Sequence, residues 1–309
     1  MTSNPVPGSV LPWERVASNK RVTWLLFFAF FLLFGALITA IVLAMGLPIG
    51  ALGIFGIFLI IYAVFSYFGS TSTVLSISGA HEVTKEEEWE FVRRVENLCI
   101  GAGLPMPRTW VIEDSAPNAF ATGISPQKAH VVVTRGLLNK LEPIELEGVI
   151  AHELSHIANY DIRVMTVTVL LVGMIALLSD LFLRFTVWGS GSRPSNRKKG
   201  GGGGGAILLV VALLAAILAP LVAQTLKFAI SRRREYLADA SGALLCRHPE
   251  ALARALEKIR DDREPLEAAN KATAHMYIHN PLREHASGLN GLFETHPPID
   301  ERIRILRSM

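Results

Sequence analysis

The sequence predicts an integral membrane protein that is mainly α-helical with a small β-sheet, in which four transmembrane helices interrupt a polar α+β domain. The first observation behind this prediction is composition: 50% of the 309 residues are hydrophobic, only 18% are charged, and the mean hydropathy is +0.37. Soluble proteins carry about a quarter charged residues, so much of this chain does not face water. The second observation is distribution, because the apolar residues are concentrated in long runs.

Composition also excludes several classes of protein. The high hydrophobic content excludes intrinsic disorder, a collagen-like repeat and an ordinary cytosolic enzyme. A net charge of +3 is small for this length and gives no reason to expect a nucleic-acid partner. Cys99 and Cys246 are too few for a disulfide framework, so we expect two unpaired thiols.

The first two apolar runs, residues 24–44 and 47–68, predict a transmembrane hairpin. Each is an uncharged stretch of about 20 residues, which is enough to cross the ~30 Å hydrocarbon core of a bilayer. The first run is longer than the apolar region of a cleaved signal peptide, and the second follows at once. Pro48 lies in the short link, and basic residues precede the hairpin, so we expect both ends of the hairpin in the cytoplasm.

Residues 164–183 and 206–223 form a second pair of apolar runs, interrupted only by Asp180, and the helix of the second run is expected to extend to about residue 230. Both runs are long enough to span a membrane. The loop between them, residues 184–205, is basic and ends in a flexible glycine run. Two interpretations stay open: both runs span and the loop lies outside, or both enter and return, which agrees better with the positive-inside rule.

The apolar runs divide the chain into five predicted segments. These are an N-terminal cytoplasmic segment (1–23), a transmembrane hairpin (24–68), the first half of the polar domain (69–162), a second membrane hairpin with its glycine-rich loop (163–230), and the second half of the polar domain (231–309). In the polar halves, β-branched residues predict strands over 109–113 and 130–134, with 118–123 a candidate third strand. Helices are expected over 84–102, 143–160 and 249–262.

The stretch AHELSHIANY, residues 151–160, carries the strongest chemical signal. His152 and His156 lie four apart on a predicted helix, so both imidazoles project from one face toward a common point. Glu153 can reach a solvent ligand of a metal held there, which is the H-E-x-x-H arrangement of zinc metallopeptidases. The alternative is a chance pair on a solvated helix. The apolar flanks argue against it, because a buried histidine pair has little purpose without a metal.

A catalytic zinc usually has three protein ligands and one open position, so a third ligand must lie elsewhere. The metzincin pattern is excluded, because Asn159 and Ile162 occupy its glycine and histidine positions. The nearest acidic candidates are Glu235 and Asp239, which share a helix face and can act together as ligand and hydrogen-bond acceptor. The small residues at 240–242 favour close packing against another helix, whereas the alternative is a solvated face near the membrane.

These motifs together resemble the HtpX-type membrane zinc metalloproteases, a gluzincin family related to the CaaX prenyl proteases. The matching stretches are NAFATG at 118–123, ELEGVIAHELSHIANYD at 145–161, EYLAD at 235–239 and THPPIDERI at 295–303. The order and spacing of the apolar runs also match, so the likeness covers nearly the whole chain. The resemblance implies that the polar halves form one zincin-like metalloprotease domain, split in sequence by a membrane hairpin.

The resemblance also implies roles for individual residues. One Zn²⁺ per chain would be bound by His152, His156 and Glu235, with Glu153 as the general base. Asp239 would accept a hydrogen bond from a ligand histidine and orient it.

Two further groups of residues are implied with less detail. His296 and Arg302 are candidates for the group that stabilises the oxyanion, and their alternative is a loop cap after two prolines. Residues 118–123 resemble the edge strand on which such enzymes bind an extended substrate by backbone pairing, and the alternative is a plain sheet edge. The residues expected to bind substrate are Asn118, Ala119, Phe120 and Ala121.

The function implied is a zinc endopeptidase that hydrolyses peptide bonds of membrane or misfolded proteins, in protein quality control or a stress response. The implied location is the bacterial inner membrane, with several passes and an active site that faces the cytoplasm. Expected partners are protein or peptide substrates and the lipid bilayer, but no nucleic acid. Two alternatives stay open: a CaaX-type prenyl-peptide protease and a non-proteolytic membrane scaffold that binds metal. The intact Glu153 argues against the scaffold, because a structural zinc site needs no base.

Overall fold

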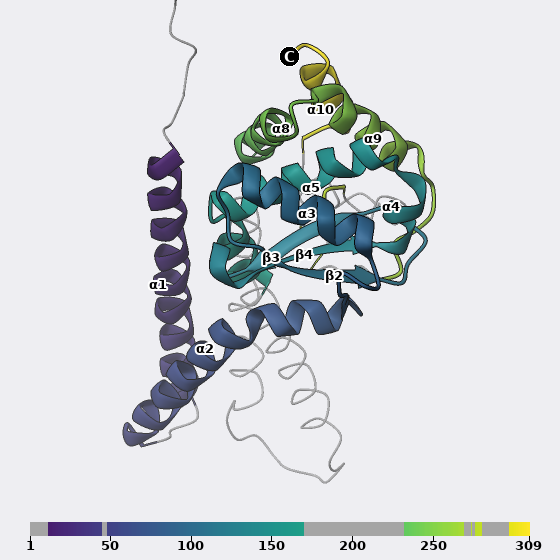
Figure 1. Cartoon of the computed structure of the whole chain (residues 1–309). Helices are drawn as coiled ribbons and strands as arrows, with labels where there is room; N and C mark the ends of the chain where they lie inside the picture. Colours follow the sequence, from purple (N-terminus) through teal and green to yellow (C-terminus); the bar gives the residue numbers. More distant parts are fainter. Residues whose placement is uncertain (1–11, 45–47, 170–231, 269–272, 274–275, 280–296) are drawn as a thin grey trace, which may run out of the picture.

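The computed structural model describes residues 12–44, 48–169, 232–268, 273, 276–279 and 297–309. In this part of the chain a small mixed sheet lies between one long apolar helix and a layer of shorter helices, and a second long helix stands beside it (Figure 1). The molecule is thus mainly helical with a small sheet, as the sequence predicts.

The two long helices are α1 (Pro12–Ala44) and α2 (Gly50–Ile77), and both are long and apolar enough to cross a membrane. They pack on each other partly through aromatic side chains, since the ring centroids of Phe27 and Tyr67 are 5.6 Å apart. Large apolar side chains on their other faces are exposed, Trp24 and Phe65 among them. An exposed apolar surface of this kind suits contact with lipid. These helices correspond to the predicted first hairpin.

Helix α1 begins well before the predicted start of the first apolar run, at Pro12 rather than near residue 24. Residues 14–21, most of them polar, continue the helix because no proline or glycine interrupts them. The second predicted hairpin, by contrast, lies almost entirely outside the described residues. Only residues 163–169 of it are described, and they belong to a largely buried helical segment that begins at residue 161. Four transmembrane helices therefore stay a prediction.

The sheet has four strands in the order β1-β2-β4-β3. Strand β2 (Arg108–Ile112) runs parallel to β4 (Ala129–Thr134), and β3 (Ala119–Gly123) pairs with β4 antiparallel. The strands expected at 109–113 and 130–134, and the candidate at 118–123, are confirmed within a residue or two. The short β1 (His81–Glu82) was not predicted, because two residues carry no periodicity. Strand β3 is last in this order, so it forms one edge of the described sheet.

Helix α5 (Pro143–Ala158) crosses one face of the sheet (Figure 1). It starts with Pro143 in its first turn and a capping box in which the backbone N–H of Glu142 donates to the Glu145 carboxylate. Its apolar residues join the odd-numbered residues of β4 in the main core, as Val149 and Val131 show. The predicted helix over 143–160 is thus confirmed.

Besides the helical segment 161–169 and a 3₁₀ turn at Pro126–Lys128, five other short α-helices belong to the described domain. Helix α3 (Trp89–Ala102) starts later than predicted, because residues 85–88 form a turn, and α4 (Arg135–Lys140) follows the last strand. Helices α8 (Arg232–Cys246), α9 (Pro249–Asp261) and α10 (Ile299–Leu306) come from the second half of the chain and pack around α5 and one another (Figure 1).

The opposite face of the sheet rests on the C-terminal part of α2. Val74 and Leu75 of this helix pack with Phe120 and Val132 from the sheet. Because alternate residues of a strand point to opposite faces, β4 contributes its odd residues to the α5 side and its even residues to the α2 side. Helix α2 is therefore both a candidate membrane span and the element that covers one face of the sheet.

Candidate metal centre

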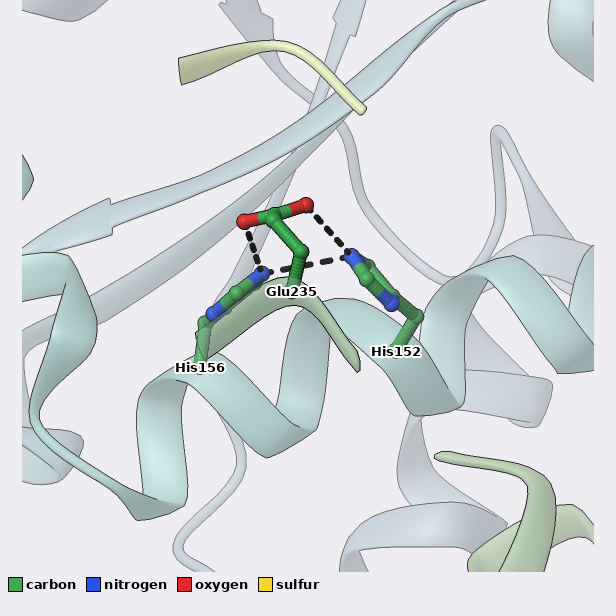
Figure 2. A group of neighbouring side chains, drawn as sticks. All are labelled: His152, His156 and Glu235. Carbon is green, nitrogen blue, oxygen red and sulfur yellow. Dashed lines mark hydrogen bonds and ion pairs between the residues drawn. The ribbon is translucent and has the colours of Figure 1, made fainter. Parts of the chain in front are cut away.

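Three side chains from two helices converge at a buried point between α5 and α8. His152 and His156 project from one face of α5, and Glu235 faces them from the first turns of α8 (Figure 2). The two histidine Nε2 atoms are 3.2 Å apart. The Glu235 carboxylate oxygens lie 3.9 Å from Nε2 of His152 and 3.7 Å from Nε2 of His156. All three side chains are buried.

Close packing of the two helices brings Glu235 to the histidines. Gly242 of α8 lies against α5, where an added Cβ would come within 2.8 Å of the His152 backbone nitrogen. Only glycine fits this contact. Glu235, Asp239 and Gly242 recur at spacings of four and three, so they share the face of α8 that meets α5. The expected close packing of residues 240–242 is therefore confirmed at Gly242.

Each histidine is backed by a carboxylate at its other ring nitrogen. Nδ1 of His152 lies 2.9 Å from Oδ1 of Asp239, and Nδ1 of His156 lies 3.1 Å from Oδ2 of Asp161. A carboxylate next to Nδ1 favours the tautomer in which Nδ1 carries the proton and Nε2 carries the lone pair. When both rings are neutral in this tautomer, two Nε2 lone pairs face each other at 3.2 Å, and neither nitrogen can donate to the other unless a proton or a metal ion lies between them. A cation between them resolves this arrangement.

The spacing of the three side chains suits zinc. Tetrahedral zinc with bonds of about 2.0–2.2 Å sets its ligand atoms about 3.3–3.6 Å apart. The observed separations of 3.2, 3.7 and 3.9 Å bracket that range. Two imidazoles and one carboxylate are also a ligand set found at catalytic zinc sites with an open fourth position. The residues present therefore fit the metal that the sequence motif implies.

The local charges favour a cation at the same point. Burial alone would lower the pKa of His156, but the hydrogen bond to Asp161 and the charges of Glu235 and Glu153 raise it to about 9. The pocket between the carboxylates therefore stabilises positive charge on His156. A metal dication placed against the same nitrogen would benefit from the same carboxylates.

Asp239 is held in its charged form by an arginine from the C-terminal helix. Arg302 donates from Nε and Nη2 to the two carboxylate oxygens of Asp239, at 2.8 and 2.7 Å. Burial would raise the pKa of Asp239, but the charge and hydrogen bonds of Arg302 and the contact with His152 lower it to about 2. The contacts of Asp239 with His152 and with Arg302 thus connect helices α5, α8 and α10.

The position of Arg302 bears on the oxyanion prediction. Arg302 is 1% exposed, and besides Asp239 it donates from Nη1 to the backbone carbonyl of Ile278. These contacts direct its guanidinium at the support of the ligand set, so we assign it a positioning role. Its predicted oxyanion role stays untested. His296, the other candidate for that role, lies outside the described residues.

Glu153 lies in the same buried pocket, with only 2% of its surface exposed. Burial raises the pKa of its carboxyl to about 7, aided by the charge of Glu235 and opposed by the charge of His156 and by the backbone of Ala121. Helix α5 packs against strand β3, so the Ala121 backbone lies close enough to Glu153 to affect this carboxyl. A carboxyl with a pKa near neutrality can both accept and return a proton, as a general base and acid must.

The expected substrate strand is present as β3, and part of its outer edge is already paired. Ile278 donates its backbone N–H to the carbonyl of Ala119 at 2.9 Å. The Asn118 side chain donates to the carbonyl of His279 at 3.0 Å, so this buried amide ties β3 to residues 276–279. Phe120 points to the α2 side, where its ring packs edge-on against Tyr277.

Asp161 and Arg234 belong to the site but were not singled out from the sequence. Asp161 ends the matching stretch at 145–161, and Arg234 directly precedes Glu235. Each residue lies near a proposed ligand in the sequence, and the sequence gives no other indication of its role. The structure adds the missing observation, because Arg234 Nε lies 2.8 Å from Oδ1 of Asp161.

Fold and site together define a class of protein. A histidine pair one turn apart, a glutamate between them and an acidic side chain from a second helix are the metal-site arrangement of a metallopeptidase. Two long apolar helices are part of the same molecule. The class is therefore a membrane metallopeptidase.

The comparisons with known proteins give the family. The chain belongs to peptidase family M48, whose sequence profile matches residues 85–309. A "Protease HtpX homolog" of Dictyoglomus thermophilum is 46% identical over 299 residues, covering 96% of this chain and 94% of the relative. Another of Listeria innocua is 47% identical over 315 residues, covering 96% and 99%. The expected family and its class, a metallopeptidase that hydrolyses peptide bonds, are thus confirmed.

A solved structure gives a weaker match. The crystal structure of S. mikatae Ste24p aligns with a TM-score of 0.48 at 21% identity. The alignment covers 81% of this chain and 57% of that protein.

Proposed function

We propose that this chain is a zinc-dependent endopeptidase in which His152, His156 and Glu235 bind one zinc ion and Glu153 is the general base. The observation that carries the proposal is the pair of Nε2 atoms that face each other at 3.2 Å while both Nδ1 atoms contact carboxylates. Glu235 completes the ligand set from a different helix. The family supports a metal at this point, and the ligand chemistry supports zinc.

The residues around the metal have separate tasks in peptide hydrolysis. Zinc, when bound, supplies a Lewis acid that lowers the pKa of water toward ~7 and polarises the scissile carbonyl. Glu153 accepts a proton from the attacking water and returns it to the leaving amine. Asp239, held by Arg302, keeps His152 in the tautomer whose Nε2 lone pair faces the metal. The burial of all these groups strengthens their electrostatic effects.

Strand β3 is the proposed platform for the substrate. It packs against α5, and its Ala121 backbone is near enough to Glu153 to affect the pKa of that carboxyl, so a peptide extended along the outer edge of β3 would pass the base. The start of that edge is paired with Ile278. A substrate peptide therefore either pairs with β3 beyond Ala119 or displaces residues 276–279. In both cases Asn118 would contribute to substrate binding, because it lies directly before the strand.

The proposed setting is the bacterial inner membrane, with four spans and the active site on the cytoplasmic side. The exposed apolar faces of α1 and α2 and the basic residues near the start of α1 support this orientation. Proposed substrates are membrane or misfolded proteins, in quality control or a stress response. Both relatives are named as proteases, which supports the proteolytic activity.

Cleavage of casein by the purified protein in detergent tests this function. Glu153→Gln should lower the turnover number by about 10²–10⁴-fold, because the base is lost while the metal ligands stay. Glu147→Gln is the matched control, since Glu147 lies on the same helix but forms a partly buried ion pair with Arg94. It should cleave casein like the wild type.

Chelation completes the test. Removal of metal with a chelator should abolish cleavage, and added zinc should restore it. Cleavage that survives both chelation and Glu153→Gln would overturn the zinc mechanism. Stoichiometric zinc without cleavage of any substrate would favour the scaffold alternative, and cleavage confined to lipidated C-terminal peptides would favour the CaaX-type alternative.

A further inference from the structure

A polar side chain of the first long helix reaches the turn behind the metal centre. Asn19 of α1 is only 6% exposed, although it lies on a helix with large exposed apolar faces. Its Nδ2 group donates to the carbonyl of Asn159 at 2.8 Å and to Oδ1 of Asp161 at 2.7 Å. Helix α1 is therefore bound by hydrogen bonds to the end of α5, the helix that carries both histidines.

The turn after α5 is shaped to bring Asp161 back to the site. Tyr160 has a positive φ of 61°, which is uncommon for a residue with a side chain, and lies in the turn between α5 and the helical segment that starts at residue 161. Directly after this turn, Oδ2 of Asp161 lies 3.1 Å from Nδ1 of His156. Lys20, the neighbour of Asn19, lies over the Tyr160 ring at 4.6 Å from its centroid. Two consecutive residues of α1 thus hold this turn.

Helix α8 closes the network through Arg234. Arg234 lies 2.8 Å from Oδ1 of Asp161 through Nε and donates from Nη2 to Oδ1 of Asn19 at 3.0 Å. The next residue is Glu235, the proposed third ligand. Asp161 is therefore the point where α1, the end of α5 and the start of α8 meet, and each of its two carboxylate oxygens has a separate task. Oδ1 receives Asn19 and Arg234, and Oδ2 faces His156.

This arrangement bears on which ring nitrogen of His156 carries the proton. A charged Asp161 favours the proton on Nδ1 of His156 and leaves the Nε2 lone pair for the metal. Asp161 is buried, so its charge needs donors that replace water, and Asn19 and Arg234 supply them. The amide of Asn19 fixes the position of Oδ1 as well, because it donates to Asp161 and accepts from Arg234 at once.

We propose that Asn19 is a positioning residue of the metal centre, which acts through Asp161 on His156 and makes metal affinity depend on the docking of α1 against the domain. This inference rests on the proposed metal site. It adds Asn19 to that site, a residue that carries no ligand atom and lies on a candidate membrane helix. Groups that support ligand histidines typically change metal affinity by 10–100-fold.

Asp161→Asn tests the first link of the chain. The substitution keeps the shape of the side chain but can turn an amide N–H toward Nδ1 of His156. That nitrogen must then accept, and the proton moves to Nε2, where it blocks metal binding. We expect the zinc dissociation constant, measured by competition with a chromophoric chelator, to rise about 10–100-fold. The absorption bands of the Co²⁺-substituted protein should shift or weaken, which a loss of stability alone would not cause.

Two substitutions at Asn19 test the second link without touching the metal-bearing helices. Asn19→Ala should raise the zinc dissociation constant by about tenfold or less, because Asp161 keeps Arg234. Asn19→Asp should raise it more, since a carboxylate retains the contact with Arg234 but repels Asp161. Ser70→Ala is the matched control: Ser70 is a buried hydroxyl of α2 that donates to the carbonyl of Tyr67, away from the metal centre. It should bind zinc like the wild type.

The melting temperature of the metal-free protein separates positioning from a merely structural role. A positioning role predicts that Asn19→Ala binds zinc more weakly than the wild type and that Asn19→Asp binds it more weakly still. These losses of affinity should exceed what any change in the melting temperature of the metal-free protein accounts for. Zinc affinity equal to wild type in both Asn19 variants would overturn the inference, even if Asp161→Asn fails to fold. Glu235→Ala, measured beside them, keeps the two proposals apart. If it alone loses zinc, the metal site stands and the inference fails; if it too binds zinc normally, the proposed ligand set is wrong.

Discussion

At the scale of single residues, the metal centre contains two sets of the same three residue types: a histidine, an aspartate and an arginine. Each ligand histidine contacts an aspartate through Nδ1, and each aspartate contacts an arginine: His152 with Asp239 and Arg302, and His156 with Asp161 and Arg234. The aspartates favour the tautomers that carry the proton on Nδ1, and each buried aspartate is paired with the positive charge of an arginine. Both histidines therefore present a lone pair to the same point.

The arginine of the first set offers a test of stability. Arg302→Met leaves Asp239 buried with its charge largely uncompensated, which should lower the free energy of unfolding by about 3–5 kcal/mol. Denaturant titration of the detergent-solubilised protein measures this loss. Arg304→Met is the control, since Arg304 is an exposed residue of the same helix and should change stability by less than about 0.5 kcal/mol. Equal stability of the two variants would show that the Asp239–Arg302 ion pair does not stabilise the fold.

The residues of the site differ in how far sequence could reveal them. His152, His156 and Glu153 could be predicted because their geometry is local to one helix. Glu235 and Asp239 followed from their shared helix face and from the family resemblance. Asn19, by contrast, depends on the docking of α1 against a turn 140 residues later, and no sequence pattern carries that contact.

At the scale of elements, the site depends on how closely two helices approach. Helices α5 and α8 meet at Gly242, two turns beyond Glu235 on the same face of α8. The glycine lets α8 come near enough for Glu235 to reach the histidine pair. A ligand set drawn from two helices therefore rests on a residue without a side chain.

This contact can be tested by adding a single methyl group. Gly242→Ala should force α8 away from α5, with a loss of about 1–3 kcal/mol in stability and a weaker affinity for zinc. Gly101→Ala is the control, because a Cβ there meets only one side-chain atom at 3.9 Å. Melting temperature and chelator competition measure the two effects. Wild-type zinc affinity in Gly242→Ala would contradict the role given to this packing.

Among the other elements, the ones with clear periodicity or terminal signals were predictable. Strands β2 and β4 are rich in β-branched residues, and α5 and α9 start at prolines. The start of α3 was predicted too early, because residues 85–88 are polar residues that suit a helix as well as the turn they form. The left-handed Tyr160 had no signal at all, since glycine or asparagine is the usual residue at such a turn.

At the scale of the whole molecule, the described long helices are part of the domain and do not merely anchor it. The end of α2 covers one face of the sheet through Val74 and Leu75, and the start of α1 holds the turn at Asp161. The metal centre, the sheet and the two candidate spans therefore form one connected structure. The predicted boundary at residue 69 between hairpin and domain thus falls inside α2, which runs to Ile77.

The orientation of this structure in the membrane can be measured by labelling single cysteines. Cys99 and Cys246 are first replaced by alanine, and cysteine is then introduced at the exposed positions Ile49 or Glu90. A maleimide that cannot cross the membrane should label Ile49→Cys in intact cells, since this position lies near the tip of the hairpin. Glu90→Cys should react only after permeabilisation. The reverse pattern would place the domain outside the cytoplasm.

In the proposed metal centre, a glutamate from the second half of the chain completes a zinc site begun by two histidines of the first half. The zinc content of the purified protein tests this directly, measured by elemental analysis in the wild type and in Glu235→Ala, with Glu147→Ala as a control on α5. We expect about one zinc per chain in the wild type and the control, and a zinc affinity lowered by at least 100-fold in Glu235→Ala. Full retention of tightly bound zinc in Glu235→Ala would contradict it.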